Sequence, residues 1–249
     1  MTRYKFARFG SICALLVLWW LAAVWTGDPS VLPSPAALVG PMRQEVMSGE
    51  LPTHLGHTLL RVLWAFCLAL VLGTGLGYVM GRNATVDSWL DSWLVVFLNL
   101  PALVLIVLCY LWIGLNETAA IAAVTLNKIP NVVTIIREGA RTFEARLEDL
   151  AQVFGMSRCD RVRHIHLPQL APYFAVAARS GLATIWKIVL VVEFLGRSNG
   201  IGFKVHLYFQ QFDVPMVLVY SLSFIAVMLV VEVLLLQPWE RAARRWRTA

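Results

Sequence analysis

The sequence contains few charged residues. Asp, Glu, Lys and Arg make up 14% of its 249 residues, whereas apolar residues make up 59%. Soluble domains carry about 25% charged and about 45–50% apolar residues, so one soluble domain of this length could not bury so much apolar surface. A lipid bilayer can cover that surface in place of a protein core. The composition therefore predicts an integral membrane protein.

Cysteine and catalytic motifs are also scarce. The sequence contains no Walker motif, no nucleophile elbow and no metal-binding motif. The four cysteines are far apart and have no metal or redox spacing, which favours inert thiols. An enzyme embedded in the membrane would need His, Asp or Glu clustered at chemical spacing. We therefore expect no catalytic residue and no metal site in this chain.

Six apolar runs predict helices that cross a bilayer, which takes about 20 residues each. They are residues 9–25, 58–80, 93–113, 119–136, 174–195 and 214–236. The runs are continuous rather than alternating, and only helices or closed barrels satisfy the backbone in lipid. The expected fold is all-α, with about six transmembrane helices. The first run could be a cleaved signal peptide, but no small-residue cleavage site follows it, so we expect a retained helix.

Basic residues indicate the orientation. With a cytoplasmic N-terminus, most of the 21 Lys and Arg residues fall in cytoplasmic segments, and only Arg43, Arg197 and Lys204 fall in external loops. The positive-inside rule therefore predicts that both termini are cytoplasmic. The net charge of +6 then reflects topology, and we expect membrane lipid rather than nucleic acid around the chain.

Two loops interrupt the apolar pattern. The external stretch 27–57 is rich in proline, and the spacing of Leu38, Met42 and Val46 predicts a short surface helix within it. The cytoplasmic stretch 137–172 is the longest polar segment.

The stretch 137–172 has the pattern of a helical hairpin. Leu147, Leu150, Ala151 and Phe154 share one helical face. Gly155 suits the end of that helix, and Ser157 suits the cap of a second, short helix that carries Arg158, Arg161 and Arg163. We expect Pro168 and Pro172 to end the loop before the next span.

This stretch resembles the EAA loop of permease subunits of bacterial ATP-binding-cassette (ABC) importers. The family pattern is Glu-Ala-Ala, a glycine six residues after the Glu, and Ile-x-Leu-Pro beginning ten residues after that glycine. Here Gly155 matches, and residues 165–168 (IHLP) fall at the expected distance. Asp149 takes the place of the Glu, with Glu148 beside it.

The resemblance extends from about residue 57 to the C-terminus. It includes residues 57–61 (HTLLR) followed by Gly73, Gly77 and Gly81, residues 111–117 (LWIGLNE), residues 178–181 (ARSG), residues 185–187 (IWK) with Glu193, and residues 200–202 (GIG). This combination is similar to permeases of nitrate, sulfonate and taurine importers. It predicts a helix and external loop over 1–56, a five-helix permease core over 57–238 that contains the loop 137–172, and a basic tail over 239–249.

The resemblance implies an ABC importer in the bacterial inner membrane. This chain would pair with a second permease copy, a cytoplasmic ATPase dimer, and a periplasmic or lipid-anchored substrate-binding protein. It would bind no cofactor, since ATP and Mg would occupy the ATPase. The short helix after the glycine would be the coupling helix. The expected coupling residues are Asp149, Ala151, Gly155, Ser157, Arg158, Arg161, Ile165, Leu167 and Pro168.

Polar residues inside the spans are candidates for the substrate pathway. They are Asn127, Lys128, Asn131, Trp186, Lys187 and Glu193. Lys128 could attract an anion, or it could snorkel or pair with an acid. Lys187 and Glu193 could instead form pairs between subunits or with other spans. Small residues repeated every four positions at Gly73 and Gly77 predict close helix packing.

The expected substrate is a small anion such as a sulfonate, nitrate or taurine. The alternatives are a vitamin precursor or another small organic molecule. An ion-driven secondary transporter is a rival interpretation, but it would not need the hairpin loop and would usually show internal repeats, which this sequence lacks.

Overall fold

The computed structural model describes the backbone of residues 2–236 and the side chains of residues 10–234, and the predicted tail over 239–249 lies outside this range. Every regular element in the described range is helical. The elements are α1 (Thr2–Thr26), α2 (Val39–Met47), α3 (Glu50–Arg82), α4 (Ala84–Asn99), α5 (Ala102–Ile113), α6 (Glu117–Arg141), α7 (Ala145–Val153), α8 (Arg158–Arg161), η1 (Val162–His166), α9 (Leu167–Gly196), α10 (Ile201–Gln210), α11 (Val214–Val231) and η2 (Glu232–Leu236). The predicted all-α fold is confirmed.

The long apolar helices agree with most of the predicted spans. Four are long and apolar enough to cross a membrane: Glu50–Arg82, Glu117–Arg141, Arg158–Gly196 and Val214–Leu234. The pair α4 and α5 makes a fifth candidate. The first predicted run lies in α1, whose described apolar part, Gly10–Thr26, is shorter than these helices.

The third predicted span is broken at Pro101. α4 ends at Asn99, α5 begins at Ala102, and the two helices are bent by 99°. Proline lacks a backbone N–H and disfavours the helical conformation in the residue before it. Leu100 is accordingly extended. α4 also begins at Ala84, well before the predicted start of this span at residue 93.

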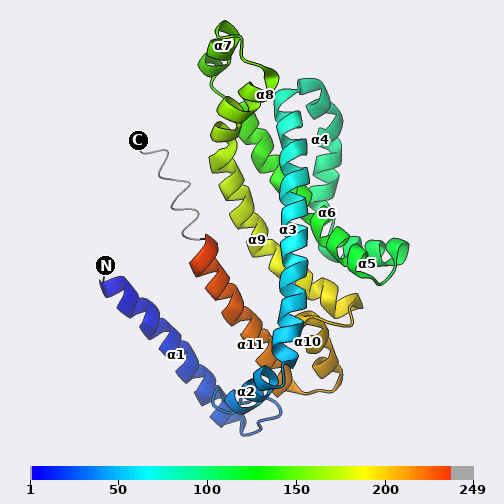
Figure 1. Cartoon of the computed structure of the whole chain (residues 1–249). Coiled ribbons are helices and arrows are strands. Elements are labelled where there is room, and N and C mark those ends of the chain that lie inside the picture. Colours follow the sequence, from blue (N-terminus) through cyan, green and yellow to red (C-terminus); the bar gives the residue numbers. More distant parts are fainter. Residues whose placement is uncertain (1, 237–249) are drawn as a thin grey trace.

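Glycines allow α3 to pack closely against α6. A Cβ atom added at Gly73 would lie 2.6 Å from the Cβ of Val132, and one added at Gly77 would lie 2.7 Å from the carbonyl oxygen of Val133. Such contacts leave no room for a side chain, so the predicted packing role of these glycines is confirmed. α9 packs against both helices, and the three form the centre of the bundle (Figure 1).

The loop and the fifth predicted span form one longer helical segment. A continuous helix runs from Arg158 through η1 into α9 and ends at Gly196. The prediction that Pro168 and Pro172 end the loop is therefore wrong. Pro168 lies in the first turn of α9 and Pro172 lies inside it. The first turn of a helix tolerates proline, and the wider π turn of η1 lies directly before it.

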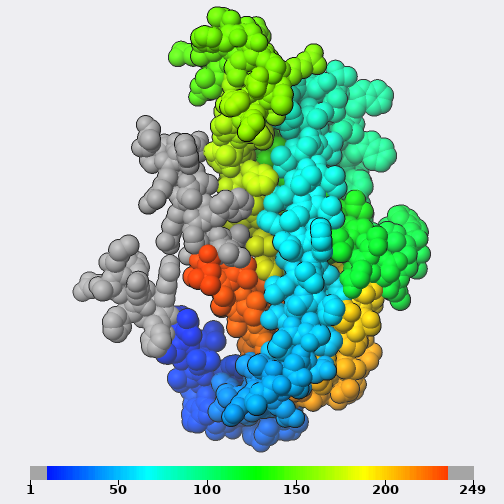
Figure 2. Space-filling model, in the orientation of Figure 1, coloured from blue at the N-terminus to red at the C-terminus, as the bar shows by residue number. Residues whose placement is uncertain are grey.

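The two ends of the bundle carry different short helices. Figure 1 shows α7 and α8 projecting beyond one end, and α2 and α10 at the other. The predicted surface helix is present as α2, and Leu38 just before it is buried. α1 leans away from the bundle in Figures 1 and 2, although the indole Nε1 of Trp19 donates to the carbonyl of Pro33 (3.1 Å).

Candidate functional site

The hairpin has the predicted local geometry. Gly155, which follows α7, has φ of +62°, a conformation that glycine adopts at little cost. The amide of Met156 donates to the carbonyl of Ala151 (2.9 Å), which closes the turn. The amide of Asp160 donates to the Oγ of Ser157 (3.1 Å), and this cap begins α8. The predicted helix, glycine turn and capped second helix are all present.

The tip of the hairpin presents apolar side chains to its surroundings. Val153 and Phe154 are 82% and 76% exposed, and Leu150 is also exposed. Figure 2 shows α7 and α8 as a knob at the top of the molecule. Ala151 is buried, so only part of the predicted apolar face packs on the chain itself. Of the other predicted coupling residues, Asp149, Arg158, Leu167 and Pro168 are exposed, and Arg161 and Ile165 are partly buried.

Glu148 attaches the hairpin to the bundle. Its Oε1 accepts a hydrogen bond from Nη2 of Arg82 (2.7 Å). The same oxygen lies 2.7 Å from Nε2 of His166. Its Oε2 lies 3.6 Å from Nη1 of Arg161. Sequence reasoning gave the acidic position to Asp149 from the spacing of the motif. It missed the contacts of Glu148 because Arg82 lies 66 residues away in the chain.

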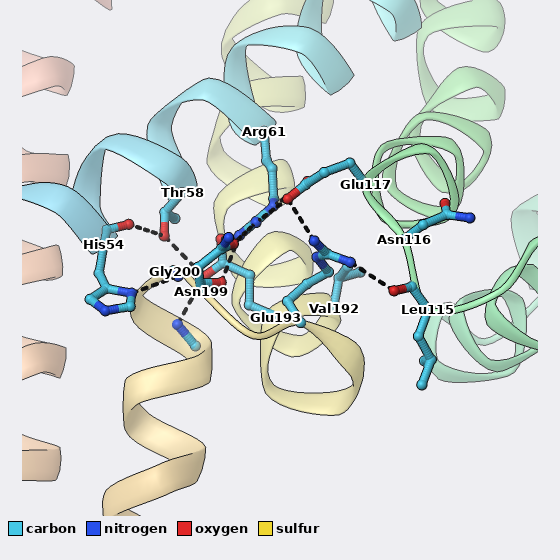
Figure 3. A network of polar contacts seen from close by, with 12 residues as sticks. His54, Thr58, Arg61, Leu115, Asn116, Glu117, Val192, Glu193, Asn199 and Gly200 are labelled. Carbon is cyan, nitrogen blue, oxygen red and sulfur yellow. Dashed lines mark hydrogen bonds and ion pairs between the residues drawn. The ribbon is translucent and has the colours of Figure 1, made fainter.

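A second polar cluster surrounds Arg61 at the opposite end of α3 (Figure 3). Nε and Nη2 of Arg61 donate to the two carboxylate oxygens of Glu117 (2.8 and 2.5 Å). Nη1 donates to Glu193 (2.6 Å) and to the carbonyl of Asn199 (2.9 Å), and Nη2 also donates to the side chain of Asn199. These bonds engage all five N–H groups of the guanidinium. We call Arg61, Glu117, Glu193, Asn199 and Arg197 the arginine cluster.

Glu193 is fully buried within the arginine cluster. Its Oε2 accepts from the hydroxyl of Thr58 (2.9 Å) and from the amide of Gly202 (2.8 Å). Gly200, which precedes α10, lies so close that any side chain there would overlap the Glu193 carboxylate. The pairing of Glu193 with another span, one of the alternatives that the sequence left open, is what the structure shows. Both of its oxygens are occupied.

Arg197 completes the cluster. Its guanidinium donates to Glu117 (2.8 Å) and to the carbonyl of Leu115 (2.9 Å). Two arginines and two glutamates thus balance in charge, and they join α3, the start of α6, the end of α9 and the turn before α10. The arrangement holds four elements together at this end. Sequence reasoning missed Arg61 because its partners lie 56 and 132 residues away.

Lys128 is the buried cation of α6. Its side chain is 3% exposed, and its Nζ lies 3.5 Å from the carbonyl of Ser180 on α9. Lys128 forms no ion pair with any described residue. Trp186 is buried, with its ring edge-on to Phe224. Of the other candidate pathway residues, Asn131 and Lys187 are exposed and Asn127 is partly buried.

The described residues offer no cluster of three or more His, Cys, Asp or Glu side chains that could hold a metal ion. The polar groups include one cluster that attaches the hairpin, the arginine cluster near the opposite end of the bundle, and a buried lysine between them. Further ion pairs join Arg137 and Arg141 of α6 to Asp87 of α4.

Comparisons with known proteins agree on one family. Residues 69–237 match the family described as binding-protein-dependent transport system inner membrane component. The chain is 27% identical over 205 residues to the putative aliphatic sulfonates transport permease protein SsuC of Bacillus subtilis (strain 168), which covers 80% of this chain and 74% of that relative. It is 27% identical over 213 residues to the taurine transport system permease protein TauC of Escherichia coli (strain K12), which covers 82% and 77%.

The fold is also similar to that of a solved transporter. A chain of the MetNI methionine ABC transporter, in an inward-facing conformation, superposes with a TM-score of 0.61 at 20% identity, covering 76% of this chain and 92% of that chain.

Proposed function

The chain belongs to the family of binding-protein-dependent transport system inner membrane components, and we propose that it is the membrane subunit of an ATP-driven importer for a small anionic solute such as an alkyl sulfonate or taurine. The proposed complex contains two permease copies, an ATPase dimer that carries ATP and Mg, and an external substrate-binding protein. The chain itself hydrolyses nothing.

The exposed apolar tip of the hairpin is the main support for the proposal that this chain binds an ATPase. Val153 and Phe154 are exposed at the end of α7, which is followed by a glycine turn, and α7 projects beyond the long helices in Figure 1. Large apolar groups in such a place are typical of a protein interface. A helix that inserts its apolar face into a groove on a partner would cover them. We propose that this groove is on the ATPase, and that α7 and α8 transmit its closure.

The proposed orientation places the hairpin in the cytoplasm. Seven arginines lie in the hairpin or at the helix ends beside it, where the positive-inside rule places basic residues in the cytoplasm: Arg82, Arg137, Arg141, Arg146, Arg158, Arg161 and Arg163. α1 starts, and α11 ends, toward that side of the bundle in Figure 1. Both termini would then be cytoplasmic, and α2 and α10 would face the external binding protein.

Lys128 supports an anionic substrate. A buried charge without a counter-ion is costly in a membrane, and the Ser180 carbonyl is the only hydrogen-bond partner of the Lys128 side chain among the described residues. A passing sulfonate would supply the missing negative charge. Asn127, Asn131, Trp186 and Lys187 remain proposed pathway residues. We assign Glu193 to holding the external end, because its oxygens are already bonded.

Purification of the tagged chain from its native membrane in mild detergent tests the partner. We expect an ABC ATPase to elute in stoichiometric amount, and to be lost from the variant Val153→Glu. The control is Phe212→Glu, which adds the same charge at an exposed apolar residue that precedes α11. A chain that elutes without an ATPase would contradict the proposal.

A further inference from the structure

Within the described residues, one side chain attaches the hairpin helix α7 to other elements. Glu148 is the only side chain of α7 that forms a hydrogen bond or ion pair with another element in the described part of the chain. Its neighbour Asp149 is exposed, and so is the acid Glu144 just before the helix. The backbone amide of Glu144, just before α7, also donates to Oε1 of Gln169 in α9 (3.0 Å). Among the side chains of α7, Glu148 therefore makes the polar contacts that position the helix relative to the spans.

The partners of Glu148 come from different elements. Arg82 is the last residue of α3, and His166 is the last residue of η1, directly before α9. The Nδ1 of His166 lies 2.6 Å from the hydroxyl of Tyr78, which also belongs to α3. The ring of Phe143 stacks on His166 with centroids 4.9 Å apart.

These contacts give α3 a link that the chain itself does not provide. α9 is covalently continuous with the hairpin through the helix that begins at Arg158, so it must follow any movement of α8. α3 has no such continuity, and it meets the hairpin through Arg82 and Tyr78. Charge-assisted hydrogen bonds of this kind are short and directional, and Glu148 is mostly shielded from solvent.

We propose that Glu148 is the positioning residue that makes α3 move together with α9 when the hairpin is displaced. This inference rests on the proposed function. Because the glycine face of α3 leaves no gap against Val132 and Val133 of α6, α6 would move with α3. Glu148 would thus pass one movement of the hairpin to α3, α6 and α9. Lys128 extends from α6 toward α9 within this group. Loss of Glu148 would leave the ATPase bound but would remove the polar link between the hairpin and α3, so that α3 would follow α9 through helix packing only.

The test is uptake per ATP hydrolysed by the whole complex, with its ATPase and binding protein, in proteoliposomes. For Glu148→Gln, we expect the ATPase to remain bound and active while the ratio falls by roughly fivefold or more, the usual size of a coupling effect. Glu144→Gln makes the same chemical change in the same hairpin at an exposed acid, and we expect its ratio to match the wild type.

The double variant Glu148→Gln with Arg82→Gln separates coupling from general damage. Residues that act through one contact are not additive, so we expect little further loss beyond Glu148→Gln alone. An unchanged ratio in Glu148→Gln, or an equal loss in Glu144→Gln, would overturn the inference. If Glu148→Gln does not assemble, Tyr78→Phe decides, because it removes one hydroxyl: a lowered ratio supports the inference and an unchanged ratio overturns it. Absence of any ATPase from the wild-type complex would instead refute the proposed function.

Discussion

Replacing Arg61 with methionine removes the centre of the arginine cluster. Arg61 is 4% exposed and donates all its N–H groups to Glu117, Glu193 and Asn199. Methionine keeps much of the apolar stem but leaves the buried carboxylate of Glu193 without its cation. Breaking a buried ion pair in this way costs about 3–5 kcal/mol. Glu117 is half exposed and can regain water, so it adds little.

The free energy of unfolding in mild detergent, from SDS-induced unfolding, measures this loss. Arg141→Met is the control, because Arg141 pairs with Glu138 and Asp87 at the surface, where such pairs contribute about 0–1 kcal/mol. For the double variant Arg61→Met with Glu193→Met, we expect a loss of unfolding free energy that is smaller than the sum of the two single-variant losses by at least about 1 kcal/mol. A loss below about 1 kcal/mol for Arg61→Met, or full additivity, would refute the reasoning.

Three further substitutions test other parts of the account. Gly155→Leu places a side chain where φ is +62°, which adds backbone strain of about 1–2 kcal/mol. This variant should uncouple ATP hydrolysis from uptake, and normal uptake would count against our interpretation of the hairpin. Gly77→Ala should destabilise the protein by about 1–3 kcal/mol in the unfolding assay because its Cβ would meet α6, whereas Gly75→Ala, with open space around it, should not; equal effects would refute the packing argument. Lys128→Met should abolish uptake of an alkyl sulfonate. It should not lower the melting temperature, because replacing a buried charge by an apolar group is neutral or stabilising. A lower melting temperature with retained uptake would identify a structural lysine.

Most of the fold could be predicted because its signals are local. Apolar runs of bilayer length predict spans wherever they occur, and the glycine repeat predicts the face of α3 that meets α6. Proline was less informative. Pro101 marks a bend of 99°, whereas Pro168 lies in the first turn of α9, within a helical segment that runs unbroken from Arg158 to Gly196. The sequence alone does not distinguish these outcomes, because proline is compatible both with a break and with the first turn of a helix.

The site was predictable only where its residues are close in sequence. The hairpin has its glycine, its Ser157 cap and its apolar face within a few residues, and all were identified. The partners of Arg61 lie on distant helices, and so does Arg82, which links Glu148 to α3, so no spacing rule connects them. The choice between Asp149 and Glu148 depended on which way each side chain points. That direction follows from the packing of α7 against Arg82 and His166.

Uptake of radiolabelled taurine by proteoliposomes tests the central claim most directly. The vesicles would contain this chain with its co-purified ATPase, the binding protein outside, and ATP inside, with no ion gradient. We expect uptake that requires hydrolysable ATP and the binding protein, and that stops with a non-hydrolysable analogue. Uptake that persists without ATP and follows an imposed ion gradient would contradict the account and favour a secondary transporter.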